Sequence, residues 1–226
     1  PPLPEGMVID LGCGSGAAGP ALATLGRRLE GVDLSPAMLE EARGTGAYDA
    51  LTEADVAGWR PEVPPALIFS NAVLHWLDDH ARLLPRLAGC LAPAGTLAVQ
   101  VPHQNNAPSH RMWLTLVEEH FPGRYDPARS PGILTALDYH DILEPLGTFS
   151  LWETEYYQRL APCDTTHPLR RFTEATFARP VLQALDAEEQ ARLGALYDTV
   201  IDRIYPRAKD GSVLFPLRRM FFTLTI

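Results

Sequence analysis

The sequence predicts an α/β fold built on a doubly wound, mostly parallel sheet, and three observations support this prediction. Short apolar runs alternate with segments of helical periodicity over the first hundred residues. Repeated strand–helix–strand units form right-handed crossovers that cover both faces of such a sheet. A glycine-rich turn at residues 12–16 joins the first apolar run to the first helical segment, and open sheets of this class bind ligands at the carboxyl ends of their strands. After Pro102 the alternation stops and longer helical segments follow.

The elements of the first hundred residues follow from apolar runs and from helix start signals. Ser35 and Pro36 provide an N-cap and a proline at the first helical position, and this pair is typical of a helix start. The expected strands are residues 7–9, 29–33, 50–55, 66–69 and 95–101, and the expected helices are residues 17–25, 36–43 and 81–91.

The remainder of the chain is richer in helical patterns. A helix at residues 111–120 precedes a Pro/Gly/Arg-rich connection, and the apolar, β-branched residues 220–226 predict a last strand. Further expected elements are helices within 137–146 and 168–208, the longest at 188–204, and a strand at 149–157. The expected division is a sheet core of residues 1–102, 135–158 and 213–226, and two helical cap insertions of residues 103–134 and 159–212.

Composition and charge exclude several classes of protein. The formal net charge of −9 argues against nucleic acid as a general partner, because a phosphate backbone requires a basic surface. No apolar run approaches the ~20 residues that span a bilayer, so no membrane partner is expected. Cys13, Cys90 and Cys163 form no CxxC pair, which predicts free thiols in a reducing bacterial cytoplasm. The chain starts at Pro1 without a methionine, so we expect a further N-terminal segment in the natural protein.

Two interpretations of the glycine turn compete. Residues 14–19 have the GxGxxG spacing of a dinucleotide-binding fingerprint, and Asp33 follows at the distance expected for a ribose contact. In the other interpretation the turn is formed by Gly12, Gly14 and Gly16, and an acidic residue at the end of the preceding strand belongs to the site.

That acidic residue, Asp10, decides between the two interpretations on electrostatic grounds. A carboxylate ~4 Å from a pyrophosphate costs roughly 1 to 4 kcal/mol, depending on the local dielectric. S-adenosylmethionine carries a sulfonium and an ammonium group and no phosphate, so a carboxylate is a favourable neighbour for it. Glycines allow the backbone to approach such a ligand closely. We therefore expect S-adenosylmethionine as cofactor and S-adenosylhomocysteine as its product.

Further cofactor contacts are expected where the next strands end. The carboxylate of Asp33 offers two acceptor oxygens to the ribose hydroxyls, and Met38 is placed to cover the adenine. Asn71 could accept from the methionine ammonium, and Trp76 could line the methyl-transfer region. The expected cofactor-binding residues are Asp10, Gly12, Gly14, Gly16, Asp33, Leu34, Met38, Ala54, Asp55, Val56, Asn71 and Trp76. Helix capping by the two later aspartates and core packing of the methionine remain open alternatives.

Four stretches resemble the successive motifs of class I S-adenosylmethionine-dependent methyltransferases: VIDLGCGSG, GVDLSPAMLEEAR, EADVAGW and FSNAVLHWLDDH. Residues 70–110, together with LWETEYYQRL and YPRAKDGSVLFPLRRMFF, resemble the trans-aconitate 2-methyltransferase family. The resemblance runs from Met7 to the C-terminus. It implies a Rossmann-like, seven-stranded, mostly parallel sheet with an antiparallel last strand. It also implies methyl transfer to a carboxylate of trans-aconitate or a similar small polycarboxylate.

The chain departs from this family's pattern at two places. Ala17 and Ala18 stand where the family often has an asparagine, and residues 171–176 read RFTEAT where the family tends to read WVKGT. The alternatives are a class I methyltransferase for another small acid, either acyl-thioester-bound or a phosphonate, and a non-catalytic paralogue that binds the same cofactor. A dinucleotide-dependent oxidoreductase is disfavoured by Asp10.

Methyl transfer to a carboxylate requires positioning and no general base, because the carboxylate is already ionised at neutral pH. No catalytic acid or base is therefore assigned. Arginines are the preferred partners for the remaining carboxylates, and adjacent residues on a strand point to opposite faces, so one of Arg218 and Arg219 is expected to face the pocket. The expected substrate-binding residues are His75, Tyr157, Arg171, Arg179, Arg218 and Arg219. The His and Asp residues at 75–80 match no usual metal-ligand spacing, so no metal is expected.

Overall fold

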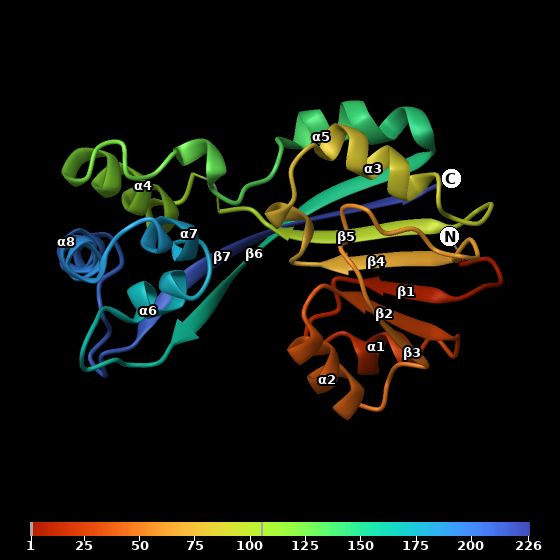
Figure 1. Ribbon diagram of the computed structural model, residues 1–226, viewed down its shortest axis with the longest axis horizontal. Coiled ribbons are helices and arrows are strands. Elements are labelled where there is room, and N and C mark those ends of the chain that lie inside the picture. Colours follow the sequence, from red (N-terminus) through yellow and green to blue (C-terminus); the bar gives the residue numbers. More distant parts are fainter. Residues whose placement is uncertain (1, 105) are drawn as a thin grey trace. The chain divides into compact units, whose positions relative to one another are not determined.

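The computed structural model describes residues 2–104 and 106–226, which divide into two compact units (Figure 1). Unit 1 contains the described residues as far as Pro102, together with Ile133–Glu153 and Met220–Ile226. Unit 2 contains the described residues of His103–Gly132 and Thr154–Arg219. Strands β6 and β7 contribute residues to both units, so the unit boundaries fall inside these two strands.

In the described part of the chain, seven strands form one sheet in the order β3-β2-β1-β4-β5-β7-β6. The strands are β1 Val8–Leu11, β2 Leu29–Asp33, β3 Ala50–Glu53, β4 Leu67–Asn71, β5 Thr96–Pro102, β6 Thr148–Leu160 and β7 Val213–Thr225. The pairs β3-β2, β2-β1, β1-β4 and β4-β5 are parallel. Beside β5, the strand β7 runs antiparallel, because Gly95 accepts from Ile226 whereas the amide of His103 donates to Arg218. The predicted fold class is confirmed.

The helices begin largely where the sequence signals predicted. Ser35 is the N-cap of α2, with its hydroxyl accepting from the Met38 amide at 3.4 Å. The helices are α1 Gly19–Ala23, α2 Pro36–Gly44, α3 His80–Ala88, α4 Pro108–His120, α5 Ala136–Leu143, α6 Pro168–Glu174, α7 Arg179–Gln183 and α8 Ala187–Ile204. Three 3-10 turns complete the set: η1 Leu74–Trp76, η2 Pro127–Arg129 and η3 Glu144–Leu146.

Two expected elements differ clearly from their predicted limits. The helix expected at 17–25 is only α1, because the glycine turn extends through Ala18. The helices expected within 168–208 are α6, α7 and α8, and α8, the longest, begins at a capping box in which Asp186 accepts from the Glu188 and Glu189 amides. The last strand begins at Val213 rather than at Met220. The sequence did not indicate this start, because a proline and two arginines stand at residues 216–219, before the apolar end of the chain.

Helices cover both faces of the sheet in unit 1 (Figure 1). On one face α3 and α5 pack with Ile9, Ile68 and Leu97 in the largest core cluster. On the other face α1 and α2 pack near β2, in smaller clusters that include Leu22 and Leu39. This arrangement leaves the carboxyl ends of β1, β2 and β4 as the edge at which a ligand can reach the turns that follow each strand.

Unit 2 has a separate core formed by α4, α6, α7, α8 and parts of β6 and β7. Trp113 of α4 stacks on Tyr197 of α8 with ring centroids 4.0 Å apart, and its indole donates to the Thr173 hydroxyl at 2.9 Å. The buried residues of β7 are odd-numbered in unit 2, Val213, Phe215 and Leu217, and even-numbered in unit 1, Met220, Phe222 and Leu224. The two arginines at 218 and 219 fall between these sets and belong to neither core.

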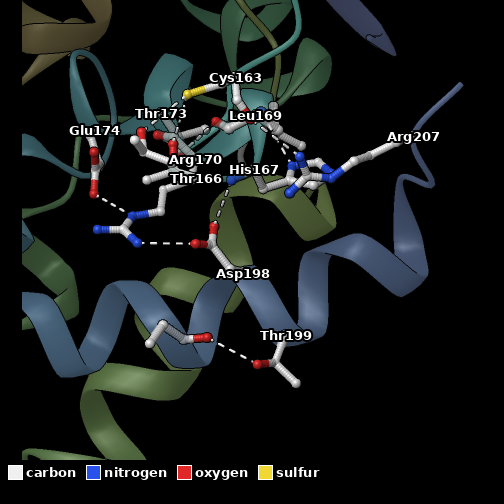
Figure 2. Close-up of polar contacts among 12 residues, drawn as sticks. Cys163, Thr166, His167, Leu169, Arg170, Thr173, Glu174, Asp198, Thr199 and Arg207 are labelled. Atoms are coloured by element: carbon white, nitrogen blue, oxygen red, sulfur yellow. Dashed lines mark hydrogen bonds and ion pairs between the residues drawn. The ribbon is translucent and has the colours of Figure 1, made fainter. Parts of the chain in front are cut away.

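A polar network joins α6 to α8 within unit 2 (Figure 2). His167 is fully buried and caps α6, with Nδ1 accepting from the Leu169 amide at 3.2 Å. Its Nε2 donates to the Tyr205 carbonyl at 3.0 Å, which fixes the neutral tautomer. Burial lowers the pKa of His167 below its ordinary value, so the cap is retained at neutral pH. Arg170 adds an ion pair to Asp198 at 3.0 Å.

Candidate functional site

The glycine turn after β1 has a backbone that only glycine adopts readily. Gly12, Gly14 and Gly16 have φ values of 77°, 53° and 83°, in the left-handed region. A Cβ on Gly12 would lie 2.3 Å from the Val73 side chain, so this glycine is also required by close packing. A Cβ on Gly14 would meet no atom within 4 Å. The open side of the turn is therefore at Gly14, where a ligand can approach the backbone.

Asp33 ties the end of β2 to this turn. One carboxylate oxygen accepts from the Gly14 amide at 2.8 Å, and the other accepts from the Ser35 amide at 2.9 Å. The bond from the Ser35 amide lies at the start of α2, as expected for helix capping, whereas the bond from the Gly14 amide fixes the glycine turn. Helix capping alone therefore does not account for Asp33. Each carboxylate oxygen retains acceptor capacity after these bonds. Asp33 is half-buried and can offer that capacity to a hydroxyl pair at the turn.

Asp10 lies at the end of β1 but is buried rather than open to the turn. Its exposed fraction is 1%, because β1 is an inner strand flanked by β2 and β4. The Tyr48 hydroxyl donates to the Asp10 carboxylate at 2.7 Å. Burial raises the pKa of Asp10 from its ordinary 3.8 to about 6, opposed by the bond from Tyr48 and assisted by the negative charge of Asp33. Asp10 is therefore mostly ionised at neutral pH and becomes protonated under mildly acidic conditions.

Apolar side chains stand exposed at the same edge of the sheet. Leu34, Met38 and Trp76 are 65%, 43% and 48% exposed, so core packing does not account for Met38. Trp76 lies in η1 with its ring centroid 4.8 Å from that of His75, and Asn71 is exposed at the end of β4. Exposed apolar surface beside polar acceptors is typical of a binding site.

Ala54, Asp55 and Val56, which were expected at the end of the third strand, differ in their exposure. Val56 is buried in the unit 1 core, which excludes its side chain from direct contact with a ligand. Ala54 packs against the same core, with its amide donating to the Asp33 carbonyl at 3.0 Å. Asp55 is exposed, and its carboxylate accepts from the Ala57 amide at 2.9 Å. Of these three residues, only Asp55 has an exposed polar side chain.

Five of the six residues expected to bind substrate belong to unit 2. Arg218 approaches the Glu155 carboxylate at 3.4 Å, whereas Arg219 approaches the neutral hydroxyl of Tyr156 at 3.4 Å. The two adjacent arginines therefore have different partners on β6, and the charge of Arg219 is not paired with an acid among the described residues. Tyr157 is 66% exposed.

Arg171 of α6 and Arg179 of α7 are the remaining two of these five residues. Both are exposed, and neither guanidinium makes a hydrogen bond or ion pair within residues 2–104 and 106–226. The positive charges of Arg171, Arg179 and Arg219 are therefore not neutralised by described acids, so each guanidinium is available to a small anion.

Two polar residues at the edge were not identified from the sequence. Tyr48, which holds Asp10, lies 38 positions further along the chain, and nothing in its local pattern points to that contact. Gln100 is 7% exposed near the end of β5, and its side-chain nitrogen has no hydrogen-bond partner in the described part of the chain. Gln100 could have been identified from the sequence, because it is a polar residue inside the apolar run that forms β5.

The edge of unit 1 fits S-adenosylmethionine better than a pyrophosphate-containing cofactor. The Asp33 carboxylate lies at the glycine turn and suits ribose hydroxyls, the buried Asp10 carboxylate adds negative charge close behind it, and exposed apolar side chains suit an adenine. Among the described residues no group of three or more potential ligands could hold a metal ion. None of the helices formed by the described residues is long and apolar enough to cross a bilayer.

Known proteins resemble this chain in sequence and in fold. The family model described as Methyltransferase domain matches residues 2–134. The trans-aconitate 2-methyltransferase of Methylobacterium nodulans is 41% identical over 225 residues, covering 95% of this chain and 84% of that protein. That of Pseudomonas aeruginosa (strain UCBPP-PA14) is 38% identical over 234 residues, with coverages of 97% and 82%. A structure of Haemonchus contortus phosphoethanolamine N-methyltransferase 2 in complex with S-adenosyl-L-methionine matches with a TM-score of 0.56 and 16% identity, covering 99% of this chain and 49% of that chain.

Proposed function

This chain belongs to the trans-aconitate 2-methyltransferase family of S-adenosylmethionine-dependent methyltransferases, and from this membership we propose that it methylates one carboxylate of trans-aconitate. Bound S-adenosylmethionine supplies an activated methyl group. The observation that carries the proposal is the pair of carboxylates, Asp10 and Asp33, at a glycine turn whose Gly14 backbone is open. This pair suits a cationic nucleoside cofactor and disfavours a diphosphate.

The edge of unit 1 holds the cofactor in this proposal. The Asp33 carboxylate accepts from the ribose hydroxyls, and Asp10 compensates the positive charge of the methionine portion. Met38 and Leu34 cover the adenine, and the exposed carboxylate of Asp55 accepts from its amino group. Asn71 and Trp76 border the methyl group, as the exposure of their side chains permits.

Substrate recognition is proposed to depend on arginines and not on a general base. A carboxylate nucleophile is ionised at neutral pH, so the protein contributes orientation and exclusion of water, which can account for ~7 to 11 kcal/mol of barrier reduction. Arg219 is the leading candidate to bind a second carboxylate, because its neighbour Tyr156 leaves its charge available. Arg171 and Arg179 are further candidates, with His75 and Tyr157 as hydrogen-bond donors.

The two units are proposed to have separate roles. Unit 1 contains the cofactor candidates, and unit 2 contains the arginine candidates, so we assign cofactor binding to the first and substrate recognition to the second. The described cysteines are free thiols, which is compatible with the proposed location in the bacterial cytoplasm.

An acid screen tests the proposed function. Purified protein is incubated with methyl-labelled S-adenosylmethionine and either trans-aconitate, cis-aconitate, isocitrate or citrate, and the methyl ester is measured. We expect the highest kcat/KM with trans-aconitate. Equal or greater kcat/KM for another acid would reject trans-aconitate as the substrate. Binding of S-adenosylhomocysteine without methylation of any acid would reject carboxyl methylation.

A further inference from the structure

Tyr48 lies between α2 and β3, and contacts β1 through its hydroxyl and the glycine turn through its ring. The hydroxyl donates to Asp10 at 2.7 Å. Among the described residues, no other group donates a hydrogen bond to the Asp10 carboxylate. The half-buried ring of Tyr48 packs with Cys13, Leu39 and Ala42, so the tyrosine spans from the core of unit 1 to the end of β1.

Three glycines leave the space that the Tyr48 ring occupies. A Cβ on Gly19 would lie 2.7 Å from the ring, and a Cβ on either Gly16 or Gly31 would lie 3.0 Å from it. Gly19 has no positive φ, so its backbone conformation does not require glycine. The last glycine of the GxGxxG spacing is therefore explained by the tyrosine ring and needs no pyrophosphate.

We propose that Tyr48 is a positioning residue for cofactor binding, which holds Asp10 as a carboxylate against the glycine turn. The inference rests on the proposed function, because it assumes that Asp10 compensates the ammonium charge that S-adenosylmethionine and S-adenosylhomocysteine share. It adds a residue to the binding machinery and gives a pH dependence to cofactor affinity.

The pH dependence follows from the groups that face Asp10. Asp33 on β2 opposes ionisation by its negative charge, and burial opposes it further, whereas the Tyr48 hydroxyl favours the carboxylate. Cys13 remains a neutral thiol, because burial raises the pKa of Cys13 to about 12. Removing the Tyr48 hydroxyl therefore removes the one described hydrogen bond that favours the Asp10 carboxylate. Burial and the negative charge of Asp33 then act unopposed, so the pKa of Asp10 rises further.

Affinity for S-adenosylhomocysteine between pH 5.5 and 8.5 tests the inference, measured by isothermal titration calorimetry. In the wild type we expect affinity to rise with pH through about 6, as Asp10 ionises. In Tyr48→Phe the midpoint should move up by about one to two pH units, because a hydrogen bond to a charged group has roughly that effect. The variant should bind about tenfold more weakly at pH 6.5 and within about threefold of the wild type at pH 8.5.

Two further variants make the result specific. Tyr139→Phe removes another buried tyrosine hydroxyl, the partner of His80 Nδ1 at 2.9 Å, and should leave the midpoint unchanged. Asp10→Asn should abolish the transition near pH 6. Titration of the Asp10 carboxyl by carbon-13 NMR gives the same comparison without ligand.

An equal loss of affinity by Tyr48→Phe at every pH, or an unchanged Asp10 titration, would overturn the positioning role while leaving the proposed function intact. If the wild type binds no S-adenosylhomocysteine at any pH, the proposed function fails and the inference fails with it.

Discussion

The Asp33 carboxylate accepts a hydrogen bond from the Gly14 amide at 2.8 Å, which joins the end of β2 to the turn after β1. This contact connects two adjacent parallel strands at the edge where the cofactor is proposed to bind. It also orients the carboxylate, so the conformation of the turn and the proposed ribose contact depend on the same residue.

Asp33→Ala should weaken S-adenosylhomocysteine binding by about 10- to 100-fold, because hydrogen bonds to a charged group are worth roughly 1.5 to 3 kcal/mol. Calorimetry measures this loss. Asp49→Ala is the matched control, since its carboxylate accepts from the Leu29 amide at the other end of β2 at 2.8 Å. The control should lose stability and keep its affinity. Unchanged affinity in the Asp33 variant would remove the ribose assignment.

Asp10→Asn should make the protein more stable at pH 7 while weakening cofactor binding. The difference between the pKa of about 6 and the ordinary 3.8 corresponds to about 3 kcal/mol of stability lost by ionising Asp10 in the folded protein. The folded state retains this proton where the unfolded state has released it, so wild-type stability falls as pH rises from about 4 to about 6.

The advantage of the Asp10→Asn variant should therefore appear across that pH window and vanish below it. Urea unfolding at a series of pH values measures it. A stability difference that is constant from pH 4 to pH 8 would contradict the buried, partly protonated state of Asp10.

Arg219→Met should raise the KM for a tricarboxylate at least tenfold more than the KM for a monocarboxylate, because a bidentate partner for the second carboxylate is lost. Arg218→Met should have a smaller effect, since Glu155 already pairs with Arg218 at 3.4 Å. Arg159→Met, which breaks an exposed ion pair with Asp210 at 2.6 Å, is the control and should change neither KM. A larger increase in the tricarboxylate KM for Arg218→Met than for Arg219→Met would assign the substrate contact to Arg218.

Gln100→Leu should raise the unfolding temperature and lower the rate of methyl transfer. The Gln100 side-chain nitrogen is buried without a described partner, and such a donor costs roughly 1 to 3 kcal/mol. Unsatisfied groups of this kind are typical of binding sites. Gln100 pairs with Asn71 in the register of β4 and β5, which places it near the cofactor edge. Increased stability with unchanged activity would show that Gln100 has no role in methyl transfer.

Local signals in the sequence were sufficient for most of the fold. The strand expected at residues 29–33 has the same limits as β2, and Ser35 caps α2 as its hydroxyl and the following proline indicated. The alternation of strand and helix segments also predicted a parallel sheet, and the first five strands pair in parallel. These features depend on residues close in the chain, whose preferences do not require knowledge of the packed structure.

The wrong boundaries and the missed residues depend on tertiary packing. The start of β7 combines Pro216 with two arginines, and its strand character comes from burial in two different cores. The contact between Tyr48 and Asp10 joins residues 38 positions apart. Asp10 is buried because β1 is an inner strand of the sheet, and this burial raises the pKa of Asp10. An aspartate in the sequence does not by itself indicate such a position.

A direct comparison of cofactor affinities tests the central claim, that the turn after β1 binds the nucleoside of S-adenosylmethionine and S-adenosylhomocysteine and not a diphosphate. Calorimetric titration of the wild type at pH 8 with S-adenosylhomocysteine, NAD and NADP measures it. We predict one site per chain for S-adenosylhomocysteine and no measurable heat of binding for either dinucleotide. Saturable binding of NAD or NADP that S-adenosylhomocysteine displaces, or dinucleotide binding without any binding of S-adenosylhomocysteine, would contradict the account.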